Sequence, residues 1–274
     1  MKAIKLILLG VSLFSILPLG AQVFDKPRSL AEADSLDRVQ YRVLYQLDFI
    51  SDPTDREYVT QDQVRLDIGT QISKVYSLKH YQADSAATPL IETGQFPRKI
   101  VTDVVPPMIL YRGYPKTQDI TTDYRLPAGA PVMSYVEPKP TLQWQVKPEK
   151  REILGHSCQR AEVSFGGRQW IAWVTSEIPL SEGPYKFGGL PGLILEVADS
   201  EGDYRYTCIG IANLSAGENI VRWKWNQRPT TRKELEKIIV QLYANPEQAI
   251  KALGGRMGFK GDPMLNLPYN PIEK

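Results

Sequence analysis

The segment CQRAEVSFGGRQWIAWVTS (residues 158–176) decides the fold class. Two runs with several β-branched and aromatic residues flank the dipeptide Gly166-Gly167, and glycine readily adopts the positive φ angles that a two-residue hairpin turn requires. We therefore predict an antiparallel hairpin. Apolar residues at both parities of WIAWV (170–174) indicate that its second strand is central and covered on both faces.

A second hairpin follows, in which LILEVAD (193–199) and YRYTCIGIA (204–212) are joined by the short turn SEGD. Other segments show the period-two alternation of strands with one face in water. They are VQYRVLYQLDF (39–49), QVRLDIG (63–69), TLQWQV (141–146) and VRWKW (221–225).

The period changes after Pro229, where TRKELEKIIVQLY (231–243) predicts a helix. Thr231 and Glu234 have the spacing of a capping box, and an apolar stripe follows them. A second short helix fits NPEQAIKALGG, with Asn245 as N-cap and Pro246 at its first position.

These patterns predict a mainly β (α+β) protein with a C-terminal helical appendage. We expect residues 22–228 to form an antiparallel β domain, and the helices and tail of residues 229–274 to pack on it. The favoured architecture is a strongly curved sheet, a half-barrel that helices plug or flank, and a β-sandwich is the alternative. Both architectures contain the same hairpins.

The N-terminus has the pattern of a signal peptide. Lys2 and Lys5 precede a short apolar run, and PLGA ends at Ala21, a small residue suited to cleavage. We expect residues 1–21 to be removed and the product to be exported, either to the periplasm or to a site associated with the outer membrane. No later stretch approaches the ~20 apolar residues of a membrane span, so no transmembrane segment is expected after cleavage.

Charge argues against nucleic acid as a partner. The chain has 33 basic and 31 acidic residues, and the loss of Lys2 and Lys5 makes these numbers equal. A balanced chain offers no broad cationic surface for nucleic acid or for an anionic membrane.

Two cysteines, Cys158 and Cys208, would meet an oxidising compartment after export. A bridge between them would close a loop of about fifty residues and stabilise the fold by ~4 kcal/mol in the chain-entropy model. The alternative is two unpaired buried thiols, and the sequence leaves both open.

Residues suited to catalysis are few. His80 and His156 are the only histidines, which excludes a multi-histidine metal site, and we predict neither a metal nor a cofactor. A thiol site could pair His156 with Cys158, and carboxylates such as Glu196 and Asp199 could perform acid–base chemistry. Structural or solvated roles for these residues are the favoured interpretation.

The most unusual stretch is GPYKFGGLPGLILEV (residues 183–197). Its hexapeptide GLPGLI (189–194), with GPYKF before it, resembles the signature of the GLPGLI family, exported proteins of Bacteroidota. The resemblance extends upstream through residues 155–179 and to the terminal YNPIEK. It implies an exported protein of unknown activity.

Two roles for this stretch remain open. In the favoured one, the glycines and Pro191 set a rigid turn that launches a buried strand. In the other, a preformed loop binds a partner. The candidate residues are Tyr185, Lys186, Phe187, Gly188, Gly189, Leu190, Pro191, Gly192, Leu193 and Ile194.

Two functional hypotheses follow. The favoured one is a non-enzymatic envelope protein that docks on an envelope or outer-membrane protein or binds a small hydrophobic ligand. Five tryptophans on predicted strands could line a site for a lipid, a peptide or a sugar, although core packing explains them as well. The alternative is a hydrolase with an unconventional carboxylate or thiol site.

Overall fold

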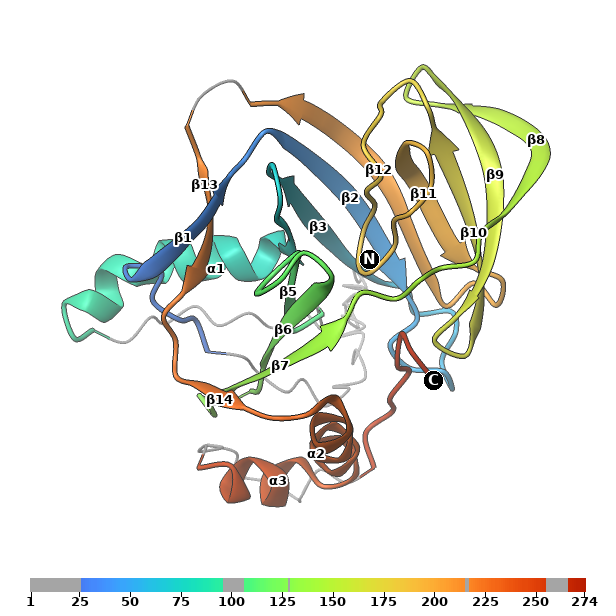
Figure 1. Ribbon diagram of the computed structural model, residues 1–274. Helices are drawn as coiled ribbons and strands as arrows, with labels where there is room; N and C mark the ends of the chain where they lie inside the picture. The colour runs from blue at the N-terminus through green and yellow to red at the C-terminus, as the bar shows by residue number, and fades with distance from the viewer. Residues whose placement is uncertain (1–25, 96–105, 128, 215–216, 255–265) are drawn as a thin grey trace, which may run out of the picture.

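The computed structural model describes residues 26–95, 106–127, 129–214, 217–254 and 266–274 (Figure 1). Twelve strands form one open sheet in the order β14-β7-β6-β5-β4-β3-β2-β12-β11-β10-β9-β8. All neighbours are antiparallel except β14 and β7, which are parallel. The strands of this sheet are β2 (Tyr41–Phe49), β3 (Thr60–Ile68), β4 (Ser73–Ser77), β5 (Met108–Arg112), β6 (Asp119–Arg125), β7 (Val132–Pro138), β8 (Gln145–Ile153), β9 (His156–Phe165), β10 (Arg168–Thr175), β11 (Leu193–Asp199), β12 (Tyr204–Asn213) and β14 (Gln227–Pro229).

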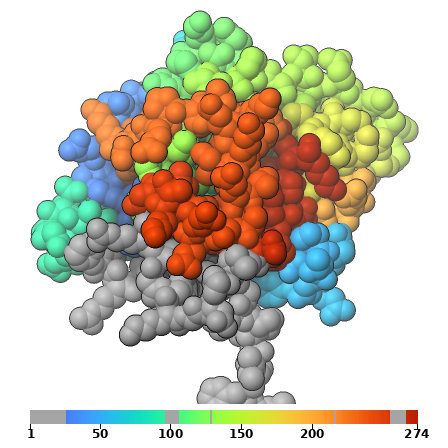
Figure 2. All heavy atoms as spheres, turned by 90° about the horizontal axis from the view of Figure 1, so that it is seen from below, coloured from blue at the N-terminus to red at the C-terminus, as the bar shows by residue number. Residues whose placement is uncertain are grey.

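Two further strands, β1 (Ala33–Arg38) and β13 (Asn219–Trp223), pair antiparallel as a separate ribbon. The ribbon lies beside helix α1 (Leu78–Glu92), as Figure 1 shows. Helices α2 (Arg232–Ala244) and α3 (Pro246–Ala252) follow near the end of the chain, and Figure 2 shows them together on one face. Their apolar side chains, including Leu235 and Ile239, pack against β6 and β7.

The fold class predicted from the sequence is confirmed, since the protein is mainly β with C-terminal helices. Twelve of the strands form one curved sheet, and two stacked sheets of a sandwich are not formed by the described residues (Figure 1). The predicted hairpin turn is present, because Gly166 and Gly167 have φ angles of 58° and 73° and Phe165 pairs with Arg168. The capping box of α2 is also formed. The division into a β domain and an appendage stays a prediction.

Several elements differ from the sequence-based expectation. Helix α1 was not predicted, because it lacks a clear apolar stripe and contains Pro89. Strands β4 to β7 were also missed. The strand predicted at residues 141–146 begins only at Gln145, because Trp144 turns inward and its indole N–H donates to Gly188 O at 2.8 Å.

The inner face of the curved sheet is covered by a loop, residues 183–190, which we call the plug loop. Helices flank the sheet, but the segment packed into its hollow is this loop. Phe187 is fully buried there, with its ring centroid 4.6 Å from that of Trp170. Arg112 on β5 donates to Phe187 O at 2.7 Å, so the loop also joins distant strands. Three other aromatic rings contact Phe187, those of Trp144, Phe165 and Tyr185.

Phe187→Ala should therefore lower the free energy of unfolding by about 3–5 kcal/mol, because it leaves a cavity among aromatic rings that cannot fully collapse. Urea denaturation measures the change. Tyr58→Ala is the control, since Tyr58 is 63% exposed and its loss should change stability by less than about 0.5 kcal/mol. Equal effects of the two variants would contradict the central role of Phe187.

Gly192, the fourth residue of the hexapeptide, lies where there is no room for a side chain. Its φ is +145°, and a Cβ built there would lie 2.0 Å from Thr175 O. Because that oxygen belongs to the backbone, the residue cannot carry a side chain without a shift of β10.

We expect Gly192→Ala to cost at least about 2 kcal/mol of stability through strain and overlap. Gly210→Ala is the matched control, because its Cβ would have no atom within 4 Å and its φ is not positive. Thermal denaturation of the two variants checks the difference. A Gly192→Ala protein as stable as the control would refute the steric role.

Candidate ligand-binding site

Most of the predicted loop residues are buried in the protein. Tyr185, Lys186, Phe187 and Leu190 are buried, whereas Gly189 and Pro191 are exposed. Leu193 and Ile194 begin β11 inside the core. This placement agrees with the turn-setting role, and binding of a partner by the loop stays a prediction.

Tyr185 and Lys186 hold the C-terminal tail. Lys186 Nζ lies 2.6 Å from Glu273 Oε1, and the Tyr185 hydroxyl donates to the same carboxylate. Burial acts to lower the pKa of Lys186, but Glu273 and its other neighbours outweigh this effect, so the pKa is raised. The lysine is thus a buried cation neutralised within the chain.

Arg168 forms a second anchor for the tail. Its guanidinium lies 2.7 Å from Asp199 and 2.8 Å from Asp203, and it donates to Asn270 Oδ1 and Pro271 O at 2.7 Å each. Asp199, Glu201 and Asp203 lie close enough together to suggest a cation site. Arg168 already occupies the centre of this group, so we assign no metal there.

The stability that this anchor contributes depends on pH, because Asp203 is titratable. Burial acts to raise its pKa, but the hydrogen bonds from Arg168 and Arg56 prevail and lower it to about 2. A carboxyl whose pKa is lowered on folding stabilises the folded state above its unfolded pKa, near 3.8, and this stabilisation is lost as the pH falls toward 2.

Asp203→Asn should therefore destabilise the protein at pH 5, and its difference from wild type should shrink by about 2 kcal/mol as the pH falls to 2. Urea denaturation at several pH values measures this convergence. If the difference in free energy of unfolding between wild type and Asp203→Asn does not change with pH, the Asp203 carboxylate is not the group whose titration affects stability.

Cys158 and Cys208 are both buried and unbonded, and they belong to the same apolar cluster. Burial raises the pKa of each thiol to about 11, so neither is a ready nucleophile. His156 Nδ1 lies 2.7 Å from Glu177 Oε2, and the Cys158 thiol donates to the backbone oxygen of His156 at 3.5 Å. The disulfide stays a prediction.

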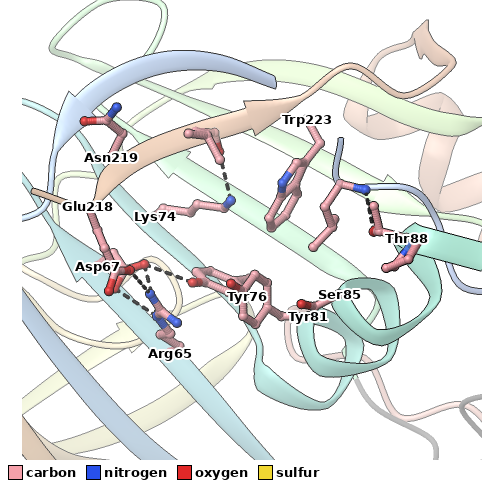
Figure 3. A pocket seen from close by; sticks show the side chains of 13 residues that line it. Arg65, Asp67, Lys74, Tyr76, Tyr81, Ser85, Thr88, Glu218, Asn219 and Trp223 are labelled. Carbon is pink, nitrogen blue, oxygen red and sulfur yellow. Dashed lines mark hydrogen bonds and ion pairs between the residues drawn. The ribbon is translucent and has the colours of Figure 1, made fainter. Parts of the chain in front are cut away.

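The outer face of the sheet carries a pocket of about 320 Å³ between β3, β4, α1 and the ribbon (Figure 3). We call it the ribbon pocket. Strand alternation places its residues there, because Val64, Leu66 and Val75 take the inner face and Arg65, Asp67, Lys74 and Tyr76 take the other. Helix α1 adds Tyr81 and Ser85, and the ribbon and the residue before it add Glu218, Asn219, Val221 and Trp223.

Two carboxylates and two guanidinium groups form a network at one wall. Arg65 lies 3.0 Å from Asp67 and 3.1 Å from Glu218, and Arg42 lies 2.6 Å from each. The Tyr76 hydroxyl donates to Asp67 at 2.9 Å. Burial raises the pKa of Asp67, although Arg42 and Tyr76 partly offset it.

Lys74 lies at the base of the pocket, pointing toward Trp223 in Figure 3. Its Nζ donates to Val221 O at 2.8 Å and lies 3.3 Å from the Trp223 ring centroid. It is 2% exposed, and burial lowers the pKa of its amine well below the usual value. A buried ionisable group in a pocket is a feature of functional sites.

Sequence reasoning did not find the ribbon pocket. It placed Trp223 on a strand and Arg65 and Asp67 on the wetter face of another, which was a usable signal. The pairing of β1 with β13 closes the pocket, and that pairing joins distant parts of the chain. No helix in the described ranges is both long and apolar enough to cross a membrane.

These features define a mainly β protein with a preformed pocket on its sheet. Residues 167–196, which span β10, the plug loop and the start of β11, match a family model described as a protein of unknown function (Porph_ging). No curated protein matches the sequence.

Similar solved structures include PNGF-II in the P21 and C2 space groups, each with 13% identity and a TM-score of 0.49. The match covers 75% of this chain and 34% or 33% of the PNGF-II chain, so the protein spans about a third of that length.

Proposed function

We propose that this protein is an exported binding protein of the cell envelope that holds a small ligand in the ribbon pocket. The pocket itself carries the proposal. It is preformed, and its volume of about 320 Å³ lies within the range of small-molecule sites. Aromatic walls, a buried amine and a fixed charge network converge on it, as expected for a site that orients a ligand.

Export is supported by the N-terminal pattern, which lies outside the described residues. The hexapeptide GLPGLI (189–194) supports assignment to the GLPGLI family of exported proteins, and it lies inside the segment that matches the family of unknown function. Periplasmic or outer-membrane-associated placement is part of the same proposal.

Binding in the pocket is favoured over docking through the plug loop, because Tyr185, Lys186 and Phe187 are already engaged within the chain. Binding in the pocket is also favoured over a hydrolase function. The buried thiols have raised pKa values, and Asp67 and Glu218 are both held by arginines, so no carboxylate of the pocket wall is left as a free base.

Blocking the pocket tests the proposal. Ser85 and Ala86 are both exposed on α1, but only Ser85 lines the pocket. Ser85→Trp should fill the pocket, whereas Ala86→Trp should leave it open. A fragment library screened by ligand-observed NMR should yield compounds that bind wild type and Ala86→Trp and lose at least about tenfold in affinity for Ser85→Trp.

Thermal denaturation confirms that both variants are folded. Native mass spectrometry of protein exported to a periplasm adds a second readout, since a retained ligand should appear in Ala86→Trp and not in Ser85→Trp. If no fragment and no retained ligand distinguishes the two variants, the ribbon pocket is not a ligand site.

A further inference from the structure

We infer that the ligand of the ribbon pocket is a neutral saccharide, a mono- or disaccharide without an ionised group. The inference rests on the proposed function and adds the chemical class of the ligand. Three properties of the lining lead to it: an aromatic wall, a polar wall with both donors and acceptors, and a balanced charge.

The aromatic wall is formed by Tyr81, which is half-buried and stacks against the buried Trp223 with ring centroids 6.1 Å apart and an interplanar angle of 28°. The face of an aromatic ring carries partial negative charge. The C–H groups on one face of a sugar ring carry partial positive charge and are flat enough to pack on such a wall. Stacking on the Tyr81 ring would bury the apolar side of the sugar.

The polar wall faces the same space. Arg65 offers N–H donors, and Asp67 and Glu218 offer carboxylate acceptors. Lys74 Nζ donates a hydrogen bond to Val221 O at 2.8 Å. A hydrocarbon ligand would cover the water-accessible parts of Arg65 and Glu218 without replacing their hydrogen bonds to water, which is unfavourable. A hydroxyl both donates and accepts, so a polyol can satisfy donors and acceptors side by side.

The balanced charge of the pocket lining disfavours an ionic ligand. Arg42 and Arg65 each pair with both Asp67 and Glu218, so these four groups neutralise one another. Lys74 is 2% exposed, and its Nζ already donates to Val221 O and lies 3.3 Å from the Trp223 ring centroid, so an incoming anion has little access to it. A carboxylate or phosphate would find no free counter-charge, whereas a neutral polyol needs none.

The volume of the pocket is consistent with a saccharide ligand. The pocket volume of about 320 Å³ is near the lower end of the roughly 300–1,000 Å³ typical of ligand sites. It suits a sugar of one or two rings and is small for a long lipid tail or a folded peptide.

Saccharide probes test the inference directly. The neutral probes are methyl β-D-glucopyranoside, methyl β-D-galactopyranoside and N,N′-diacetylchitobiose, and the charged probes are glucuronate, glucosamine and glucose 6-phosphate. Saturation-transfer NMR and isothermal titration calorimetry measure binding to wild type, Tyr81→Leu and Ser85→Trp. Tyr58→Leu is the control, because Tyr58 is exposed and outside the pocket.

At least one neutral probe should bind wild type and Tyr58→Leu, lose about tenfold in affinity for Tyr81→Leu, and lose detectable binding to Ser85→Trp. Preferential binding of a charged probe would overturn the saccharide class as stated. Failure of all sugars, with fragments still sensitive to Ser85→Trp, would overturn the class and leave the proposed function intact. Failure of both sugars and fragments would overturn both.

Discussion

Burial of Phe187 in the hollow of the sheet is the interaction on which the rest of the structure depends. An open sheet of twelve strands exposes an inner face that no second sheet covers, and the plug loop supplies the missing layer. Its backbone accepts a hydrogen bond from Arg112 on one half of the sheet, while its aromatic ring packs on Trp170 of the other half. The loop thereby fixes the curvature that both halves share, and its neighbours Tyr185 and Lys186 fix the tail.

The core and the ribbon pocket are two faces of the same strands. Along β3 and β4, one parity packs against the plug loop and the other lines the pocket. A change in register would therefore exchange core and pocket residues together, because side chains alternate with a period of two. Arg65, Asp67 and Lys74 lie on the same strands as these core residues. The packing of the inner face therefore also fixes the backbone positions of the pocket residues. This arrangement explains how a pocket rich in charge can be held in a fixed geometry, as a binding site on regular strands should be.

Local chemistry made much of the fold predictable. Gly166-Gly167 and the Thr231–Glu234 capping box each identify an element by interactions between near neighbours in sequence. Helix α1 was hidden because packing, and not a stripe of its own, stabilises it around Pro89. The pocket was hidden for a different reason. Its polar residues were visible on β3, but the closure by β1 and β13 depends on the pairing of Ala33 with Trp223, which no local pattern encodes.

The order of the strands has a kinetic consequence. The sheet consists of two meanders, β2 to β7 and β8 to β12, in which nearly every pairing is between consecutive strands, and they meet where β2 pairs with β12. That seam joins Tyr41 to Asn213, so its formation must overcome far more loop-closure entropy than any hairpin. Each meander can assemble early, whereas the seam forms late, an order that pulsed hydrogen exchange can time. If the chain is exported as proposed, a seam that forms late would leave the two meanders separate during translocation.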